Sequence, residues 1–372
     1  MIATASIDVV QATEASRWLR LLDGLPHAFG HRPEYVQAAA DVAGASAVLW
    51  SWTRGEARAA CPLLLRTGPG GLELATPPGF AGLTVAGGAD VVAAHLASDW
   101  TACWRGAGAV CAYLQASPWL RFHARDVAAW GTQGASAGPG ADCLLWDLTG
   151  SPDGLLSAMS PKHRQLLRRW LRGSPRIVDD QATLVAGFPA MYADFIARRE
   201  VSAAYRYDRA ALVRVLGAPG SFLLGVRGVD GALEAATLFL SADGRGDSFL
   251  NAATPAGRGH SRGLYWLGAL RLREMGVREL NLGGGLPGED GLADFKRRLG
   301  ATPVATTVLR QVIDAAGFAR ACATTGADPT SPWFPPWRAP LGRAGLAGIQ
   351  AGAQTSTCLR ADAEAGERSK SP

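Results

Sequence analysis

Residues 279–300 read ELNLGGGLPGEDGLADFKRRLG, and this stretch decides the fold expected for the second half of the chain. The apolar run that ends at Leu282 predicts a strand, the glycines after it a tight turn, and residues 291–298 a short helix. Residues 283–288 match G-x-G-x-x-G, but Pro287 lies inside the pattern and no ribose-binding acid follows at the required distance. A dinucleotide fingerprint is therefore excluded, and the glycines predict close approach of the backbone to another group.

The segments before this stretch predict alternating helices and strands. Ser160 is a good N-cap, Pro161 suits the first helical position, and Gly173 ends the helix between them. A second helix is predicted over 262–275, where apolar residues recur at helical spacing. Three apolar runs between them are separated by Asp-Gly turns and predict antiparallel strands: 221–227, 232–240 and 247–252.

The first half has a similar pattern. Helices are predicted at 14–24 and 33–43, the second opening with Pro33. Apolar runs separated by turn residues then predict a meander of antiparallel strands, at 46–53, 57–66 and 71–76. The expected fold class is therefore α/β (α+β), with two tandem domains, each a mixed, mostly antiparallel sheet flanked by helices.

The domain boundary is predicted near Thr149-Gly150-Ser151-Pro152, where turn residues cluster. The N-terminal domain is expected to span 1–150 and the C-terminal domain 151–325. Residues 326–372 contain several prolines and end in polar residues, which predicts a poorly ordered tail.

The charge of the chain is uneven. Of the 372 residues, the first 150 include nine basic and twelve acidic ones, whereas the remainder include 28 basic and 20 acidic ones. We therefore expect the second half to bind the anionic partner. The 37 basic residues include only three lysines, Lys162, Lys296 and Lys370, which draws attention to each of them.

Several classes of protein are disfavoured. The six cysteines form no C-x-x-C pair and the six histidines show no ligand spacing, so neither a metal site nor a tightly bound cofactor is expected. The chain has no apolar run of 18 residues and no secretory signal at its start, which favours a cytoplasmic protein. No G-x-S-x-G elbow or Cys–His pairing marks a covalent nucleophile.

Two regions predict anion binding. The turn from Arg258 to Gly263 opens a helix, where free N–H groups and the helix dipole favour anions. The helix at 160–172 carries basic residues, among them Lys162 and Arg164, and has no acid with which to form i,i+4 pairs. An anion such as a phosphate would relieve the repulsion, although a solvated surface is the alternative.

Four segments together carry a family resemblance: His31–Tyr35, Ser160–Arg164, Glu279–Gly285 and Gly291–Gly300. Over roughly residues 20–315, the chain resembles the Fem-like or BioF2-like branch of the Gcn5-related N-acetyltransferase (GNAT) superfamily. This branch includes peptidyltransferases that add amino acids to cell-wall precursors, and relatives that use acyl-CoA. The resemblance implies two tandem GNAT-like acyltransferase domains. It also implies an acyl-CoA or aminoacyl-tRNA donor and a small-molecule or cell-envelope-precursor amine as acceptor.

The resemblance also implies roles for individual residues in the C-terminal domain. Lys296, in the Phe-Lys pair, would point into the groove and stabilise negative charge on the transferring carbonyl. The turn at 258–263 loosely fits the GNAT pyrophosphate loop, which implies that the donor phosphates bind there: Arg258, Ser261, Arg262 and Gly263. Residues expected to bind substrate are Lys162, Arg164, Gly283, Gly284, Gly285 and Phe295.

Acyl transfer to an amine also needs a route for the amine proton. Glu289 and Asp294 lie near the Gly-rich turn in sequence and are the candidate proton acceptors, although a solvated or capping role is the alternative. The function expected is an N-acyltransferase that works by direct attack, without a covalent enzyme intermediate. Two alternatives stay open: a non-catalytic protein with this fold, and a nucleic-acid-binding protein that uses the 160–172 helix.

Overall fold

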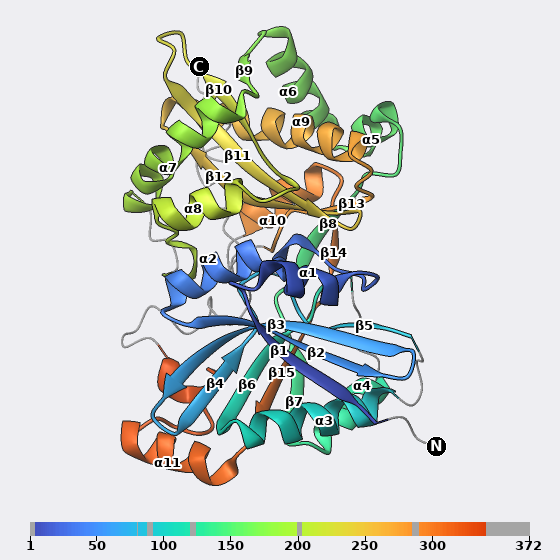
Figure 1. Ribbon diagram of the computed structural model, residues 1–372. Coiled ribbons are helices and arrows are strands. Elements are labelled where there is room, and N and C mark those ends of the chain that lie inside the picture. Colours follow the sequence, from blue (N-terminus) through green and yellow to red (C-terminus); the bar gives the residue numbers. More distant parts are fainter. Residues whose placement is uncertain are drawn as a thin grey trace. The chain divides into compact units, whose positions relative to one another are not determined.

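The computed structural model describes residues 4–79, 81–87, 92–119, 124–198, 203–284 and 290–339. The chain divides into two compact units, each built around one sheet (Figure 1). The first unit takes the chain up to Ala141 and resumes at Ala305, whereas the second takes Asp142–Val304.

Among its described residues, the first unit has an eight-stranded sheet in the order β1-β2-β3-β4-β6-β15-β7, with β5 paired to β3. Its strands are β1 (Ser6–Gln11), β2 (Ser46–Arg54), β3 (Ala57–Gly68), β4 (Gly71–Ala75), β5 (Thr84–Ala86), β6 (Ala109–Gln115), β7 (Ala135–Pro139) and β15 (Thr307–Val312). Its α-helices are α1 (Ala15–Leu22), α2 (Pro33–Ala43), α3 (Val92–Gly106), α4 (Ala124–Gly131) and α11 (Ala315–Thr325).

The antiparallel meander predicted for the first half is confirmed. β2 pairs with β3 from Ser46↔Leu65 to Arg54↔Ala57, and β3 continues into β4 through a second antiparallel ladder. The connection between β2 and β3 contains Gly55 at a φ of +61°, a conformation that glycine adopts without steric cost.

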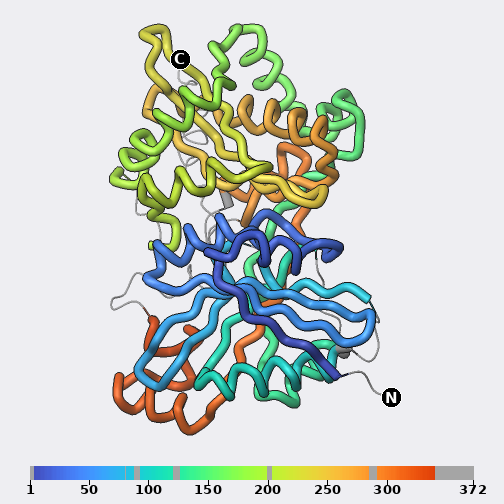
Figure 2. The backbone as a smooth tube through the Cα atoms, in the orientation of Figure 1, coloured from blue at the N-terminus to red at the C-terminus, as the bar shows by residue number. Residues whose placement is uncertain are grey.

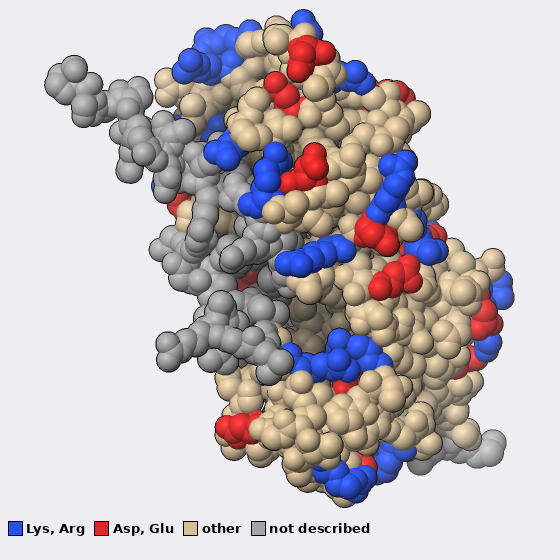
Figure 3. Space-filling model, turned by 90° about the vertical axis from the view of Figure 1, so that its left-hand side faces the viewer, with Lys and Arg blue, Asp and Glu red and all other residues tan. Residues whose placement is uncertain are grey.

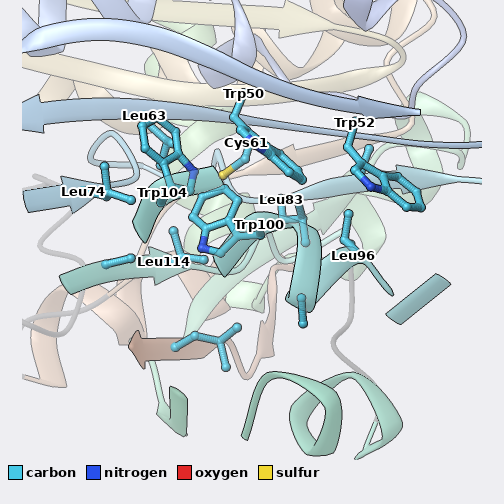
Figure 4. Close-up of a cluster of buried hydrophobic side chains, with 14 of the residues drawn as sticks. Trp50, Trp52, Cys61, Leu63, Leu74, Leu83, Leu96, Trp100, Trp104 and Leu114 are labelled. Atoms are coloured by element: carbon cyan, nitrogen blue, oxygen red, sulfur yellow. The ribbon is translucent and has the colours of Figure 1, made fainter. Parts of the chain in front are cut away.

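A cluster of tryptophans fills the core of this unit (Figure 4). The ring of Trp100, on α3, makes edge contacts with Trp50, Trp104 and Trp130, at centroid distances of 4.9, 5.8 and 5.6 Å. Such edge-to-face pairs add to the hydrophobic stabilisation that burial of these large rings provides. The cluster joins strand β2 to the two helices that pack on the sheet.

Gln311 of β15 connects this core to the last strand of the unit. Its side chain is fully buried, accepts a hydrogen bond from Trp100 Nε1 at 3.0 Å, and donates to Thr101 Oγ1 and to the carbonyl of Gln133, each at 2.9 Å. All three partners lie in residues far earlier in the chain, so β15 is held in the first unit by polar as well as ladder bonds.

The start of the segment expected to be a poorly ordered tail is instead packed on the first unit. The buried Glu73 carboxylate of β4 accepts hydrogen bonds from Trp337 Nε1 at 2.6 Å and Arg338 Nε at 2.9 Å, while Phe334 stacks on Phe318 of α11. A buried carboxylate needs such partners, which explains why residues 326–339 are fixed. Residues 340–372 lie outside the described residues.

The second unit has a seven-stranded sheet in its described residues, in the order β14-β8-β13-β12-β11-β10-β9. Its strands are β8 (Cys143–Asp147), β9 (Arg176–Val178), β10 (Ser221–Arg227), β11 (Leu233–Ala242), β12 (Arg245–Ala253), β13 (Glu279–Asn281) and β14 (Thr302–Val304). Its α-helices are α5 (Pro152–Ala158), α6 (Pro161–Arg172), α7 (Gln181–Ala197), α8 (Arg209–Leu216), α9 (Ser261–Glu274) and α10 (Asp290–Arg298).

Helices cover both faces of the second sheet. A Cβ atom on Gly268 of α9 would lie 2.1 Å from the Phe239 ring, so that helix packs tightly on β11. On β10, Phe222 stacks on Phe239, whereas Gly225, three residues on and therefore on the opposite face, lies against Leu184 of α7. None of the described helices combines the length and the apolar character needed to cross a membrane.

The expected α+β class, with tandem domains built on mixed sheets, is confirmed, but the division of the chain differs from 1–150 and 151–325. β8 precedes residue 150 yet pairs with β13 and β14, and β15 precedes residue 325 yet pairs with β6 and β7 (Figure 2). Each unit therefore completes its sheet with a strand that the sequence reading placed in the other domain. Strand pairing over such separations has no local sequence signal.

We predict that Gln311→Leu destabilises the first unit by about 2–4 kcal/mol, because it removes the partner of the Trp100 indole N–H and of the Gln133 carbonyl and one of the two bonds of the Thr101 hydroxyl. Chemical denaturation followed by tryptophan fluorescence measures the change. The matched control is Gln165→Leu on the exposed face of α6. Equal unfolding free energies for the two variants would show that the Gln311 bonds do not hold β15.

Candidate functional site

The Gly-rich turn after β13 holds the side chain of Lys296. Gly283 adopts a φ of +74°, and its N–H donates to the Asn281 side-chain oxygen at 2.8 Å, which fixes where the turn starts. Lys296 Nζ on α10 donates to the Gly284 carbonyl at 2.6 Å, and the side chain is fully buried. Turn and helix, which the sequence linked only by proximity, are thus joined by a buried cationic hydrogen bond.

Burial changes the protonation of Lys296. Desolvation lowers its pKa to about 7, and the Cys143 thiol on β8 acts in the opposite direction. Near neutral pH, the side chain therefore exchanges between ammonium and amine, which an exposed lysine does only near pH 10.

Asp294, the sequence-predicted proton acceptor whose side chain the structure describes, is bonded elsewhere than to this lysine. Asp294 forms an ion pair with Arg298 at 2.6 Å on the same helix, and both side chains are more than 40% exposed, at 42% and 45%. That pairing is typical of an i,i+4 surface bridge. Glu289 and Gly285 lie outside the described residues.

Phe295, next to Lys296, is where three helices of the second unit converge. Its ring lies 5.3 Å from His163 of α6 and 6.1 Å from Tyr265 of α9, measured between centroids. The Arg262 guanidinium stands 5.7 Å from the centre of the same ring. A cation over an aromatic face is attracted by the ring quadrupole, so Arg262 is oriented by Phe295 as well as by its helix.

His163 is a residue of this cluster that the sequence reading missed. Burial, together with the neighbouring Arg262, lowers its pKa to about 4, so the ring is neutral at pH 7. Its Nδ1 atom is buried and has no hydrogen-bond partner among the described residues. The sequence placed it within the Ser160–Arg164 segment of the family resemblance and on the basic side of this helix, without a role of its own.

The residues expected to bind donor phosphates lie at the start of α9 but differ in exposure. Arg258 is exposed, in the 3₁₀ turn Ala256–His260 that leads into the helix, and Arg262 is half-buried. Ser261 is fully buried and donates to the Asn251 side-chain oxygen at 3.3 Å. The two arginines therefore stay candidates for phosphate binding, whereas the Ser261 hydroxyl already has a partner on β12.

Gly263 has a structural reason that differs from the expected one. A Cβ atom there would lie 2.4 Å from the ring of Trp170, which packs across this turn of α9 from α6. Trp170 Nε1 donates to His260 Nδ1 at 2.8 Å, which leaves His260 Nε2 as the donor to Glu234 at 3.2 Å. The space beside Gly263 is thus taken by an indole ring, and a bulky residue there would disturb the packing of two helices.

Helix α6 presents the basic face that its sequence predicted. Ser160 caps the helix by accepting from His163 N at 3.4 Å, and Gly173 ends it. Lys162 is exposed, and Arg164 donates to the Ser157 carbonyl at 2.7 Å. In the described part of the chain, no carboxylate lies within ion-pair distance of four basic side chains of this helix: Lys162, Arg168, Arg169 and Arg172.

Charge is not segregated in this way everywhere. On the face drawn in Figure 3, Lys and Arg side chains lie in separate groups, and Asp and Glu side chains lie among several of them.

The surroundings of Lys296 suit stabilisation of a developing negative charge better than attack by a thiol. A buried amine with a pKa near 7 can stabilise a developing negative charge when it is protonated. Cys143, the nearest thiol, is buried and has its pKa raised to about 12, so it is protonated at neutral pH and a poor nucleophile. Among the described residues, no group of three or more His, Cys, Asp or Glu side chains could hold a metal ion.

We predict that the stability gap between Lys296→Met and the wild type depends on pH. A lysine whose pKa is lowered in the folded state opposes folding fully below pH 7. Between pH 7 and 10 the folded lysine is neutral and the unfolded one is still protonated, so folding releases a proton and its cost falls as the pH rises. The wild type should gain up to about 1.4 kcal/mol per pH unit relative to the variant over this range. Urea titrations from pH 6 to 10 measure this difference in unfolding free energy. A difference that does not change with pH would contradict a lowered pKa of Lys296.

Known proteins were compared with the chain by sequence and by structure. Neither family models nor curated protein sequences match it. Its structure is similar to that of FemX, with a TM-score of 0.62 and 10% identity over 81% of this chain and 96% of the other. It is also similar to the C-terminal domain of a putative lysylphosphatidylglycerol synthetase from Agrobacterium fabrum, with a TM-score of 0.55 and 16% identity over 84% and 95%.

A third solved structure, L-PGS from Bacillus licheniformis, has a TM-score of 0.54 and 11% identity over 85% of this chain and 97% of the other. Identities this low show the fold alone. The coverage shows that the likeness extends over both units and over nearly the whole of each neighbour. The chain therefore shares the two-unit fold of FemX and of these synthetase structures, as expected from the motifs around Lys296.

Proposed function

We propose that the protein is an N-acyltransferase, which moves an acyl group from acyl-CoA, or an aminoacyl group from aminoacyl-tRNA, to an amine by direct attack. The observation that carries this proposal is Lys296, a fully buried cation held by the Gly284 carbonyl beside the Gly-rich turn. A buried charge is costly unless it has a function or a partner, and one carbonyl oxygen satisfies only one of its three N–H groups.

Lys296 would act on the carbonyl of the donor. Attack by an amine places negative charge on the carbonyl oxygen, and a compact ammonium suits a single oxygen of this kind better than a planar guanidinium does. Because the group is desolvated, its interaction with that charge is stronger than it would be in water. The Phe295 ring, fixed by contacts with α6 and α9, would hold α10 in place.

The basic residues of α6 and α9 support an anionic donor. Both acyl-CoA and aminoacyl-tRNA carry phosphates, and the exposed Arg258 with the half-buried Arg262 would bind them at the start of α9. Lys162 and Arg164 are the proposed contacts to the rest of the substrate, together with Gly283, Gly284 and Phe295. The unpaired basic face of α6 also fits the second candidate, a nucleic-acid-binding protein.

Binding measurements separate these candidates. The purified protein is heated with acetyl-CoA, longer acyl-CoAs, charged tRNA or uncharged RNA of the same length, and its unfolding temperature is recorded. A ligand at 100 times its Kd stabilises the folded state by about 2.7 kcal/mol. Protection by an acyl-CoA or by charged tRNA alone supports acyl transfer, and equal protection by any RNA would favour nucleic-acid binding.

We predict that Lys296→Met lowers kcat by about 100- to 1,000-fold with little change in the Kd of the donor, because the lost charge acts on the reacting oxygen. The matched control is Arg297→Met, the exposed next residue of α10. Steady-state kinetics with the donor found above measure both. A Lys296→Met variant as active as Arg297→Met would remove the lysine from the reaction.

Another prediction concerns the exposed cations. Arg258→Ala and Lys162→Ala should raise the Kd of the donor or acceptor several-fold at low salt and by less at high salt, because exposed charges are screened. Titration calorimetry at two ionic strengths measures the effect, with Arg278→Ala, an exposed arginine beside β13, as the control. A loss of affinity that is independent of salt would contradict a phosphate contact.

A further inference from the structure

Asp247 lies on β12 beside the strand that leads into the Gly-rich turn. The two strands run parallel, and Asp247 is in register with Asn281 of β13. The Asn281 side-chain nitrogen donates to Asp247 Oδ1 at 2.9 Å. A carboxylate is thereby fixed at the end of β13, where the chain begins to turn toward Lys296.

Asn281 connects this carboxylate to the turn. Its amide group donates to Asp247 with the nitrogen and accepts from Gly283 N with the oxygen, at 2.8 Å. The next residue, Gly284, accepts the bond from Lys296 Nζ. A carboxyl group and an amine, 49 positions apart in the sequence, are thus joined through one side-chain amide and one turn.

The surroundings of Asp247 keep it from being an ordinary surface acid. Its side chain is partly buried, and in the described residues Asn281 is its one hydrogen-bonding partner, with no cation within ion-pair distance. Burial raises the pKa of Asp247 to about 7, against the effect of the Asn281 bond.

The Cys143 thiol interacts electrostatically with both Asp247 and Lys296. Among the charges that act on the pKa of its buried thiol, Asp247 and Asp142 raise it and Lys296 lowers it. The thiol is therefore near enough to both the carboxylate and the amine to respond to each. Because its pKa is raised, the thiol is protonated at neutral pH and adds no charge of its own near either group.

We infer that Asp247 accepts the proton of the attacking amine in the proposed acyl transfer, an assignment that rests on the proposed function. The amine nitrogen forms a bond to the acyl carbonyl carbon, the oxygen takes the negative charge beside Lys296, and the nitrogen loses its proton to an Asp247 oxygen. The intermediate then collapses, the bond from carbon to the sulfur of CoA or the ester oxygen of tRNA breaks, and that atom leaves with the electron pair. Asp247 returns the proton to the leaving atom.

The sequence-predicted acid Asp294 suits this step less well. It is already engaged in an ion pair with Arg298 at 2.6 Å, and its side chain is 42% exposed to solvent. Asp247 has neither a cationic partner nor full hydration. A proton acceptor is most effective when its pKa lies near the working pH.

The test uses the full chain with the donor identified by thermal protection. Asp247→Asn keeps the shape of the side chain and can still accept from Asn281, but it cannot take up a proton. We expect kcat to fall by about 100- to 10,000-fold with the donor Kd unchanged. In the wild type, kcat should rise with pH up to about 7 as the carboxylate forms, and the variant should lack this rise. Asp243→Asn, in the exposed β11–β12 turn, is the control.

A second variant covers the case in which Asp247→Asn does not fold. Asp247→Ala is assayed with and without added formate, a small carboxylate that fits the space left, and we expect at least a tenfold recovery of kcat that the wild type does not show. Near-normal turnover by Asp247→Asn, or no recovery with formate, overturns the assignment while acyl transfer stands. If the wild type turns over no donor and amine pair, the proposed function fails and takes this assignment with it.

Discussion

A positive charge that is removed from water constrains everything around it, and in this protein that charge is on Lys296. Among the described residues its Nζ atom binds one carbonyl, that of Gly284, and the preceding Gly283 adopts a φ that other residues rarely reach. Asn281 then has to end β13 with its amide oxygen on the Gly283 N–H. A short strand, a turn and the last turn of α10 are in this way determined by the need to keep one ammonium hydrogen-bonded.

Helices α6 and α9 of the second unit also help to fix Lys296, because both contact the neighbouring Phe295. α6 and α9 meet through Trp170 and Gly263, and both reach the Phe295 ring through His163 and Arg262. The start of α6 is in addition bonded to the end of α10, because Ser160 N donates to the Arg298 carbonyl at 2.9 Å. The residue next to Lys296 is therefore held by aromatic packing, while Lys296 itself is held by a backbone oxygen. Packing and polar contacts fix successive residues of a single helix.

Local sequence signals predicted much of this. Capping residues at Ser160 and Gly173, the Asp-Gly turns, and the apolar runs with turn residues between them at β2 and β3 predicted helices and strands close to those observed, since each depends on a few neighbouring residues. The partners of β8 and β15 could not be predicted in this way, because a ladder between distant segments leaves no pattern in either. Gly263 was expected among the donor-phosphate residues, and the sequence could not show that Trp170, 93 positions earlier, packs against it. Asp247 and His163 were missed because each looks ordinary until its neighbours are known.

The position of β15 has a consequence for how the protein is made. The strand lies between β6 and β7, so until residues 307–312 have left the ribosome these two strands lack the neighbour that joins them. An incomplete sheet exposes unpaired N–H and C=O groups along both edges of the gap, which other chains can use to associate. The second unit, Asp142–Val304, has by then been synthesised in full, so it can fold before the unit that precedes it in sequence. The order of folding would then be the reverse of the order of translation.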